Sequence, residues 1–429
     1  MKKTPRAAAL SILEKCRRNG AWSDALIDSV LSDAALDGRD AALCTRLCTG
    51  VQQNSALCDF YIDCYSTTKS SRLEPKILDI LRMGVYQLLF MDRIPAHAAV
   101  SESVALAKAH NPRAAGMVNA VLRRVAENVQ DLPQVPGKGT PEYLAIQYSH
   151  PLWLCRLLTE ERGYAFTEAF LAANNMPPAV TAQVNTLKTD TAQLRRQLMD
   201  EGVESEEAEV PGSLILPAPG DLKKLKSFQD GMFYVQDNAA RLAVQTASPA
   251  PGERVLDACA APGGKSFAAA IAMKNQGEIL SCDIHENKLR RIQSGAQRLG
   301  IGCISTRVMD ARCPAGELSA AFDLVLADVP CSGIGVIRKK PDIRQKSEED
   351  LRRLPQIQLD ILRGLSRTVK PGGALLYSTC TVLRRENEDV VQAFLTENTH
   401  FTVEAGPRTL FPHIDGTDGF FICKLRNMA

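Results

Sequence analysis

The chain has 429 residues, of which 45% are hydrophobic and 23% are charged, and its formal net charge is +2. The length exceeds one ordinary domain, and the composition excludes a mostly disordered or collagen-like chain. No stretch approaches the roughly 18 consecutive apolar residues of a membrane span. We therefore expect two or three folded domains and no membrane-spanning segment.

The start of the chain and its cysteines both indicate a reducing compartment. Met1 to Arg6 lead into an amphipathic stretch rather than an apolar leader, so we expect a cytoplasmic protein without a secretory signal. The 13 cysteines are then expected to be free thiols, most of them small buried hydrophobic side chains. The pairs Cys44/Cys48 and Cys58/Cys64 are not Cys-x-x-Cys pairs and lack a nearby histidine, so we expect no metal site.

The first 135 residues predict an all-helical domain. Between Pro5 and Arg18, apolar side chains recur with the helical period, and strand-like alternation is missing. Further helices are expected at residues 40–64, 74–91, 98–110 and 114–127. The stretch 132–141, which contains three prolines and two glycines, marks a domain boundary.

Residues 141–235 predict a small α/β domain. Helices are expected at 153–162, 167–174 and 191–201, and strands at 180–184, 213–216 and 232–235. The region has 8 Lys and Arg against 13 Asp and Glu, a net charge of −5, which leaves +7 for the rest of the chain. A solvated acidic face explains this run most simply, and RNA binding would depend on basic residues placed elsewhere.

Residues 236–429 predict a doubly wound α/β domain. Strands are expected at 254–257, 278–282, 304–308, 322–327 and 374–378, and helices at 265–275, 287–299, 347–369 and 386–398. Two last strand candidates, 409–413 and 419–425, flank the turn signal Asp415-Gly416-Thr417-Asp418. This alternation predicts a Rossmann-like, mainly parallel sheet with helices on both faces, and a terminal antiparallel hairpin.

A run of small residues follows the first strand of this domain. Small residues let a ligand lie against the backbone, and the helix that follows offers free N–H groups at the carboxyl edge of the sheet. The run lacks both G-x-G-x-x-G and G-x-x-x-x-G-K-[ST], which disfavours a nicotinamide-dependent oxidoreductase and a P-loop enzyme. Its residues are Cys259, Ala260, Ala261, Pro262, Gly263, Gly264 and Lys265.

Three aspartates close the next three predicted strands. Asp283 lies about twenty residues beyond the glycines, a spacing that suits a carboxylate binding ribose hydroxyls. Asp310 and Asp328 follow at the ends of the third and fourth strands. A single aspartate at a strand end is more often a cap or turn residue. Three at one sheet edge favour a polar pocket for a nucleoside-bearing cofactor with an amino group.

Two cysteines lie at the same predicted edge. Cys331 stands in Asp328-Val329-Pro330-Cys331-Ser332-Gly333, and Cys380 stands in Ser378-Thr379-Cys380-Thr381. Either thiol alone would be read as a buried hydrophobic side chain. Both follow the ends of neighbouring strands, where loops carry function, so the pattern favours reactive thiols.

Together these runs resemble the RNA cytosine-C5 methyltransferases that use S-adenosylmethionine. Within them the chain is similar to the RsmB (Sun/Fmu) type, which acts on small-subunit (16S) ribosomal RNA and has an N-terminal domain similar to NusB. The resemblance spans nearly the whole chain. The NusB-like motifs lie at residues 82–88, 94–100 and 118–124, and further matching stretches lie at 184–186, 235–237 and 335–343.

The resemblance implies a role for each candidate site residue. Cys259 to Lys265 would contact the cofactor backbone, Asp283 the ribose, and Asp310 the adenine side. Asp328 would serve the methionine amino end or the target base. Cys380 would be the nucleophile that adds to cytosine C6, and Cys331 would help to release the product. Val329, Thr381 and Gln183 stand where Ala, Ser and Arg are common in the family, and Gln183 puts one basic RNA contact in doubt.

The resemblance also implies the partners. The expected substrate is 16S ribosomal RNA, naked or in an early assembly form, and the expected protein is a monomer without a metal or a membrane partner. One alternative is the same chemistry on another RNA such as tRNA. Another is a non-catalytic RNA-binding factor in which the helical domain acts, a hypothesis that the intact cysteines and glycine-rich loop disfavour.

Overall fold

The computed structural model describes residues 4–19, 24–34, 36–218 and 220–429. Met1 to Lys3, on which the leader interpretation partly rests, lie outside these ranges. The chain forms two compact units, one of Met1–Met176 with Ile337–Glu348 and the other of Pro177–Val336 with Glu349–Ala429. None of the described helices has the length and hydropathy that a bilayer crossing needs.

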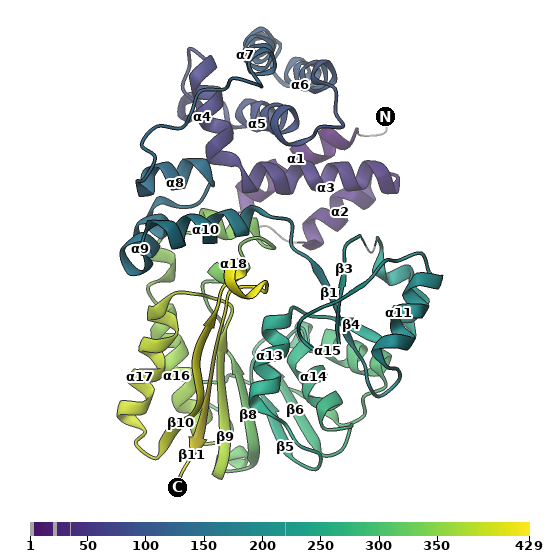
Figure 1. The fold of residues 1–429 in the computed structure, drawn as a ribbon, viewed down its shortest axis with the longest axis vertical. Coiled ribbons are helices and arrows are strands. Elements are labelled where there is room, and N and C mark those ends of the chain that lie inside the picture. The colour runs from purple at the N-terminus through teal and green to yellow at the C-terminus, as the bar shows by residue number, and fades with distance from the viewer. Residues whose placement is uncertain (1–3, 20–23, 35, 219) are drawn as a thin grey trace. The chain divides into compact units, whose positions relative to one another are not determined.

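The described part of the first unit is helical, as predicted (Figure 1). Its core is formed by the apolar faces of the first helices, including Ile12, Leu47, Ile80 and Leu122, all nearly inaccessible to solvent. The predicted helix 40–64 is two helices that meet at Asn54. The helices are α1 (Pro5–Asn19), α2 (Asp24–Ala34), α3 (Gly38–Gln53), α4 (Ser55–Tyr65), α5 (Pro75–Phe90), α6 (Ala96–His110), α7 (Ala115–Glu127), α8 (Pro141–Gln147), α9 (Leu152–Arg162) and α10 (Tyr164–Asn175).

The segment Ile337–Glu348 belongs to this helical unit, although in sequence it lies between two strands of the parallel sheet. Arg344 holds it there from a buried position. Burial lowers the pKa of its guanidinium to about 9, because the charged form loses its hydration. The guanidinium donates hydrogen bonds to the carbonyls of Gln53, Tyr148, Ser149 and Asn174 and to the side chain of Asn175.

The second unit begins with a four-stranded antiparallel sheet in the order β2-β3-β1-β4. Buried Asn185 ties it to the remainder of the unit by donating to the carbonyls of Gly231 and Leu299. The strands are β1 (Val180–Val184), β2 (Glu206–Glu207), β3 (Ser213–Leu216) and β4 (Phe233–Val235), with helices α11 (Thr191–Asp200) and α12 (Lys226–Gln229). The compact units therefore separate within the region 141–235, after Met176, because α8 to α10 pack with the helical unit.

The rest of the second unit holds a seven-stranded sheet in the order β10-β11-β9-β8-β5-β6-β7. Strands β5 to β9 pair in parallel, while β11 is antiparallel to both β9 and β10, so the predicted mainly parallel sheet with a terminal hairpin is confirmed. The strands are β5 (Arg254–Asp257), β6 (Glu278–Asp283), β7 (Ile304–Val308), β8 (Phe322–Asp328), β9 (Val369–Thr379), β10 (Phe401–Leu410) and β11 (Phe420–Asn427).

Helices cover both faces of this sheet (Figure 1). Alternate residues of β8 serve the two layers: Leu324 and Leu326 join one core, and Val325 and Ala327 join the other. This alternation follows from the strand period of two. The helices are α13 (Asn238–Ala247), α14 (Gly264–Ala272) and α15 (Glu286–Leu299) on one face, and α16 (Leu354–Ser366) and α17 (Glu388–Glu397) on the other.

Three predicted elements in this unit differ most from the structure. The helix expected at 347–369 begins only at Leu354, because Pro355 is tolerated in a first turn and would break a helix interior. The strand expected at 374–378 starts at Val369 and runs through Pro371. The penultimate strand lies at Phe401–Leu410 rather than at 409–413, and the short helix α18 (Pro412–Asp415) follows it.

Candidate active site

The run of small residues forms the loop between β5 and α14. Gly263 has a φ of 110°, a conformation that residues with a Cβ rarely adopt. At Gly264 a Cβ would lie 2.8 Å from Nε2 of Gln236, so glycine lets this side chain approach the start of α14. The two glycines thus allow a tight loop at the carboxyl end of the central strand β5.

The candidate site residues lie along the carboxyl edge of the sheet in the order of its strands. Cys380 follows β9. Asp328 is the last residue of β8, and Cys331 lies in the loop after it. The glycine-rich loop follows β5, Asp283 is the last residue of β6, and Asp310 follows β7. The thiols therefore lie on one side of the glycine-rich loop, and Asp283 and Asp310 lie on the other side. This order separates a reactive half of the edge from a half suited to binding.

The two aspartates on the binding side differ in their partners. Asp283 is 8% exposed, and its Oδ1 accepts a hydrogen bond from the backbone N–H of His285. Asp310 is held by Arg312, whose Nε and Nη2 donate to its carboxylate. That hydrogen bond lowers the pKa of Asp310 from its ordinary value, so this side chain is an anion engaged by its own loop.

Lys265 and Asp328 form an ion pair in the middle of the edge. Nζ of Lys265 lies 2.7 Å from Oδ2 of Asp328 and 5.0 Å from the ring centroid of Phe420. Oγ of Ser378 donates to Oδ1 of Asp328 over 2.9 Å. The lysine side chain therefore reaches the strand that precedes Cys331. Ser378, which the sequence interpretation assigned no role, fixes the other carboxylate oxygen.

The two candidate thiols lie against each other. Sγ of Cys331 is 3.2 Å from Sγ of Cys380, and both residues are half-buried. The hydrogen bond with Cys380, followed by burial, raises the pKa of Cys331 well above its ordinary value. Cys331 therefore holds its proton more tightly than a free thiol does, and it can donate that proton in the hydrogen bond to the sulfur of Cys380.

Three further predictions from the sequence concern Gln183, a metal site and the other cysteines. Gln183 is buried and bonded to Gln236, Asn238 and Ser213, so its side chain is not presented to an RNA. No three His, Cys, Asp or Glu side chains within the described ranges gather as metal ligands would. Seven of the free cysteines are buried: Cys16, Cys44, Cys48, Cys58, Cys155, Cys282 and Cys423.

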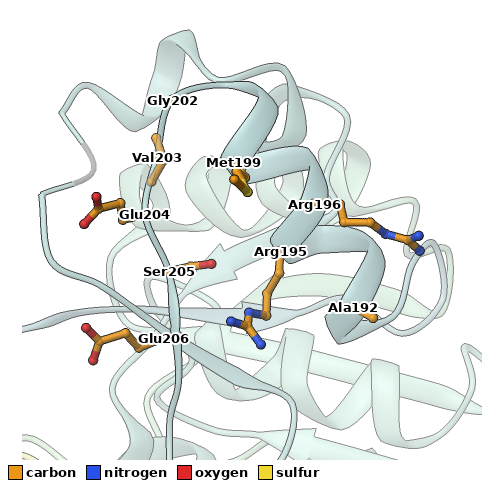
Figure 2. Close-up of a pocket in the computed structure, with 9 residues that line it drawn as sticks. All are labelled: Ala192, Arg195, Arg196, Met199, Gly202, Val203, Glu204, Ser205 and Glu206. Carbon is orange, nitrogen blue, oxygen red and sulfur yellow. The ribbon is translucent and has the colours of Figure 1, made fainter.

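A separate cavity of about 940 Å³ lies beside α11 and holds none of the predicted site residues. Arg195 and Arg196 come from the helix, and Glu204 and Glu206 come from the segment facing it (Figure 2). Arg195 is already paired with Glu207 over 2.8 Å, and Arg196 points away from the two carboxylates (Figure 2). The mixed charge and the distance along the fold from the thiols leave this cavity outside the candidate active site.

Gly335 offers a test of how the two thiol loops are packed. Its N–H donates to the carbonyl of Cys380, and a Cβ there would lie 1.9 Å from the carbonyl oxygen of Gly419. Gly335→Ala is expected to lower the free energy of unfolding by about 1–3 kcal/mol, measured by urea denaturation. Gly316→Ala, where no atom lies within 4 Å of the added Cβ, is the control, and equal stabilities of the two variants would contradict the packing.

Asp257, at the end of β5, is expected to make stability depend on pH. Burial raises its pKa from 3.8 to about 6. The hydrogen bond from Ser266 and the charge of Lys265 oppose this rise, and the charge of Asp328 adds to it. The folded state binds the proton more tightly, so the stabilisation is complete below about pH 4 and is lost as pH rises through about 6. Relative to wild type, Asp257→Asn should gain about 3 kcal/mol in free energy of unfolding between pH 4 and pH 8. A difference that does not change with pH would show that Asp257 titrates normally.

The comparisons with known proteins agree with this geometry. The description "16S rRNA methyltransferase RsmB/F" matches residues 244–426, "NusB family" matches 3–127, and a "Methyltr_RsmF/B-like, ferredoxin-like domain" matches 150–223. A solved structure described as PH0851 covers 98% of each chain at 27% identity with a TM-score of 0.81. Fold and site thus define an S-adenosylmethionine-dependent ribosomal RNA methyltransferase with a NusB-like N-terminus.

The relatives narrow the class further. "Probable ribosomal RNA small subunit methyltransferase B" of Bacillus subtilis is 37% identical over 99% of both chains. "Ribosomal RNA small subunit methyltransferase B" of Erwinia tasmaniensis is 34% identical over 90% of both. The chain belongs to the ribosomal RNA small subunit methyltransferase B family.

The residues at the carboxyl edge fit the methyl donor of this family. Oδ1 of Asp257 is a buried acceptor without a partner in the described part of the chain, and Asp283 adds an acidic group on the neighbouring strand. Hydroxyl and amine groups of a nucleoside and an amino acid supply the donors that such oxygens lack. The loop is partly open to solvent, with Pro262 exposed and Ala261 and Gly264 partly exposed, which suits a ligand lying across it.

Proposed function

We propose that this protein methylates C5 of a cytosine in small-subunit ribosomal RNA through a covalent bond between Cys380 and C6 of the base. The observation that carries the proposal is the pair of thiols, 3.2 Å apart, beside the ion pair of Lys265 and Asp328. Methylation of a nitrogen or a hydroxyl would need one base or none, whereas methylation of a pyrimidine carbon needs a nucleophile and a separate way to remove a proton.

The chemistry follows from the weak nucleophilicity of C5. The thiolate of Cys380 forms a bond to C6, and the electrons of the C5–C6 double bond move to C5, which becomes an enamine carbon. C5 can then accept the methyl group. Afterwards Cys331, once its own proton has left to solvent, or a water beside it takes the proton from C5, the double bond reforms, and the bond from C6 to Cys380 breaks.

The neighbouring charges support the addition. Asp328 is a candidate to accept a hydrogen bond from N3 of the base once N3 is protonated, and that proton offsets the negative charge that develops on the ring when the thiolate adds. Lys265 and Ser378 hold the two oxygens of Asp328, so the carboxylate is oriented before the base arrives. Since Cys331 holds its proton more tightly than a free thiol does, it does not compete with Cys380 as a nucleophile.

S-adenosylmethionine, when bound, supplies an electrophilic methyl group. We assign its binding to the loop from Cys259 to Lys265, with Asp283 at the ribose and Asp310 at the adenine side. The target base must leave its stack to reach the thiols, which favours a loop or a locally opened stretch of RNA. We place the protein in the cytoplasm, acting as a monomer on free or early-assembly RNA.

Bisulfite mapping of ribosomal RNA from a strain that lacks the gene tests the proposal. We expect protection to be lost at one small-subunit cytosine and restored by the wild-type chain. Protection lost in tRNA instead would assign the other RNA substrate. An unchanged pattern in both RNAs, with S-adenosylmethionine binding absent by calorimetry, would favour a non-catalytic RNA-binding factor.

A further inference from the structure

Two consecutive buried side chains, Glu386 and Asn387, lie behind the two thiol loops. Both are fully inaccessible to solvent, and both come from the turn that leads into α17. Neither belongs to the motifs that pointed to the active site. Each contacts a different thiol loop, as the hydrogen bonds of the two side chains show.

Glu386 holds the loop of Cys331. Its Oε2 accepts the backbone N–H of Ser332 over 2.8 Å and Nε2 of Gln358 over 2.9 Å. Gln358 donates from the same nitrogen to the carbonyl of Pro330. The residues before and after Cys331 are thus fixed by one carboxylate and the amide that it orients.

Asn387 holds the loop of Cys380 in the same manner. Its Oδ1 accepts the hydroxyl of Thr379 over 2.6 Å, and its Nδ2 donates to the carbonyl of Thr381 over 3.0 Å. These are the residues immediately before and after Cys380. A single amide therefore spans the nucleophile's position in the chain.

The buried carboxylate is the costly part of this arrangement. Oε1 of Glu386 is buried without a hydrogen-bond partner in the described part of the chain. Burying a carboxyl group costs stability, and hydrogen bonds to one of its oxygens recover only part of that cost. A carboxylate at this position is therefore better explained by its effect on the Cys331 loop than by stability.

We propose that Glu386 and Asn387 are positioning residues with separate tasks: Glu386 sets Cys331 for product release, and Asn387 sets Cys380 for addition to the base. The inference rests on the proposed function, in which the two thiols act in different steps. It assigns one positioning residue to addition and another to product release, and each of the two residues can be replaced separately.

The test compares Glu386→Ala and Asn387→Ala in the full-length protein with unmodified small-subunit ribosomal RNA and S-adenosylmethionine. A misplacement of about 1 Å costs on the order of a hundredfold in rate. For Glu386→Ala we expect turnover to fall roughly 10–100-fold, while adduct formation in a single turnover stays close to wild type and the adduct persists on denaturing gels. For Asn387→Ala we expect adduct formation itself to fall roughly 10–100-fold, with no accumulation.

Controls separate positioning from folding. Glu386→Gln keeps an oxygen that accepts the Ser332 N–H, so it should restore much of the turnover. Gln358→Met, of similar volume, should accumulate adduct as Glu386→Ala does. It replaces Glu386→Ala in the test if that variant does not fold. Asp389→Asn, which changes an exposed partner of Arg384, should behave as wild type, and all variants should bind S-adenosylmethionine normally in calorimetry.

The outcomes distinguish the inference from the function on which it rests. Adduct trapped by Cys331→Ala but absent from both Glu386→Ala and Gln358→Met would overturn the inference alone. Equal losses of addition and release in the two alanine variants would also overturn it, since both residues would then be merely structural. No adduct even with Cys331→Ala would overturn the proposed release step and the inference with it.

Discussion

Replacing Cys380 with alanine is expected to lower methyl transfer to RNA by at least about a thousandfold. The reason is chemical, because C5 of cytosine cannot take the methyl group until a nucleophile has added to C6. We expect that the neighbouring thiol does not take over, because burial still raises the pKa of Cys331 when the hydrogen bond with Cys380 is gone. The measurement is transfer of radiolabelled methyl groups to unmodified small-subunit RNA.

The matched control for Cys380→Ala is Cys313→Ala, which removes an exposed thiol of the same unit. It should transfer methyl groups at the wild-type rate. The Cys380→Ala variant should still bind S-adenosylmethionine, because Cys380 lies on the reactive side of the glycine-rich loop. Full activity in Cys380→Ala would remove it as the nucleophile.

Replacing Cys331 with alanine is expected to give the opposite result, an enzyme that forms the covalent bond and does not break it. Without the thiol 3.2 Å from Cys380, the proton on C5 has no nearby acceptor, and elimination of Cys380 slows. Turnover should fall by about a hundredfold or more, while RNA and protein migrate together on denaturing gels. The double variant Cys331→Ala/Cys380→Ala should form no such complex.

An adduct that survives in the double variant would show that some other residue bonds to the RNA. A Cys331→Ala enzyme with normal turnover and no adduct would show that the second thiol has no part in release. Either result would leave the short distance between the sulfurs without a catalytic explanation.

Local patterns predicted the parts of the site that adjoin strand ends. The strands at Arg254–Asp257 and Ile304–Val308 have the predicted bounds, because apolar runs flanked by turns leave few alternatives. Once the sheet is parallel, its carboxyl edge collects whatever follows each strand. That rule alone brings Cys331, Cys380 and the glycine-rich loop to neighbouring positions.

Long-range packing was beyond the reach of local patterns. The segment Ile337–Glu348 joins the helical unit through the hydrogen bonds of Arg344 to backbone carbonyls, and acceptors of that kind leave no trace in the sequence. The sequence pattern predicts that a helix begins at Glu386. In the structure, Glu386 and Asn387 precede α17 and are fully buried. Their partners are Ser332, in the loop after β8, and Thr379, at the end of β9, so only the folded chain reveals their common position.

The central claim is that the methyl group goes to C5 of cytosine, and tritium release tests it most directly. Small-subunit ribosomal RNA made with [5-³H]cytosine is incubated with the enzyme and ¹⁴C-labelled S-adenosylmethionine, and tritium in water is counted against ¹⁴C in RNA. We expect one tritium released for each methyl group transferred, because C5 must lose its hydrogen to regain the double bond. Methyl transfer with the tritium retained would place the methyl group on another atom and contradict the mechanism.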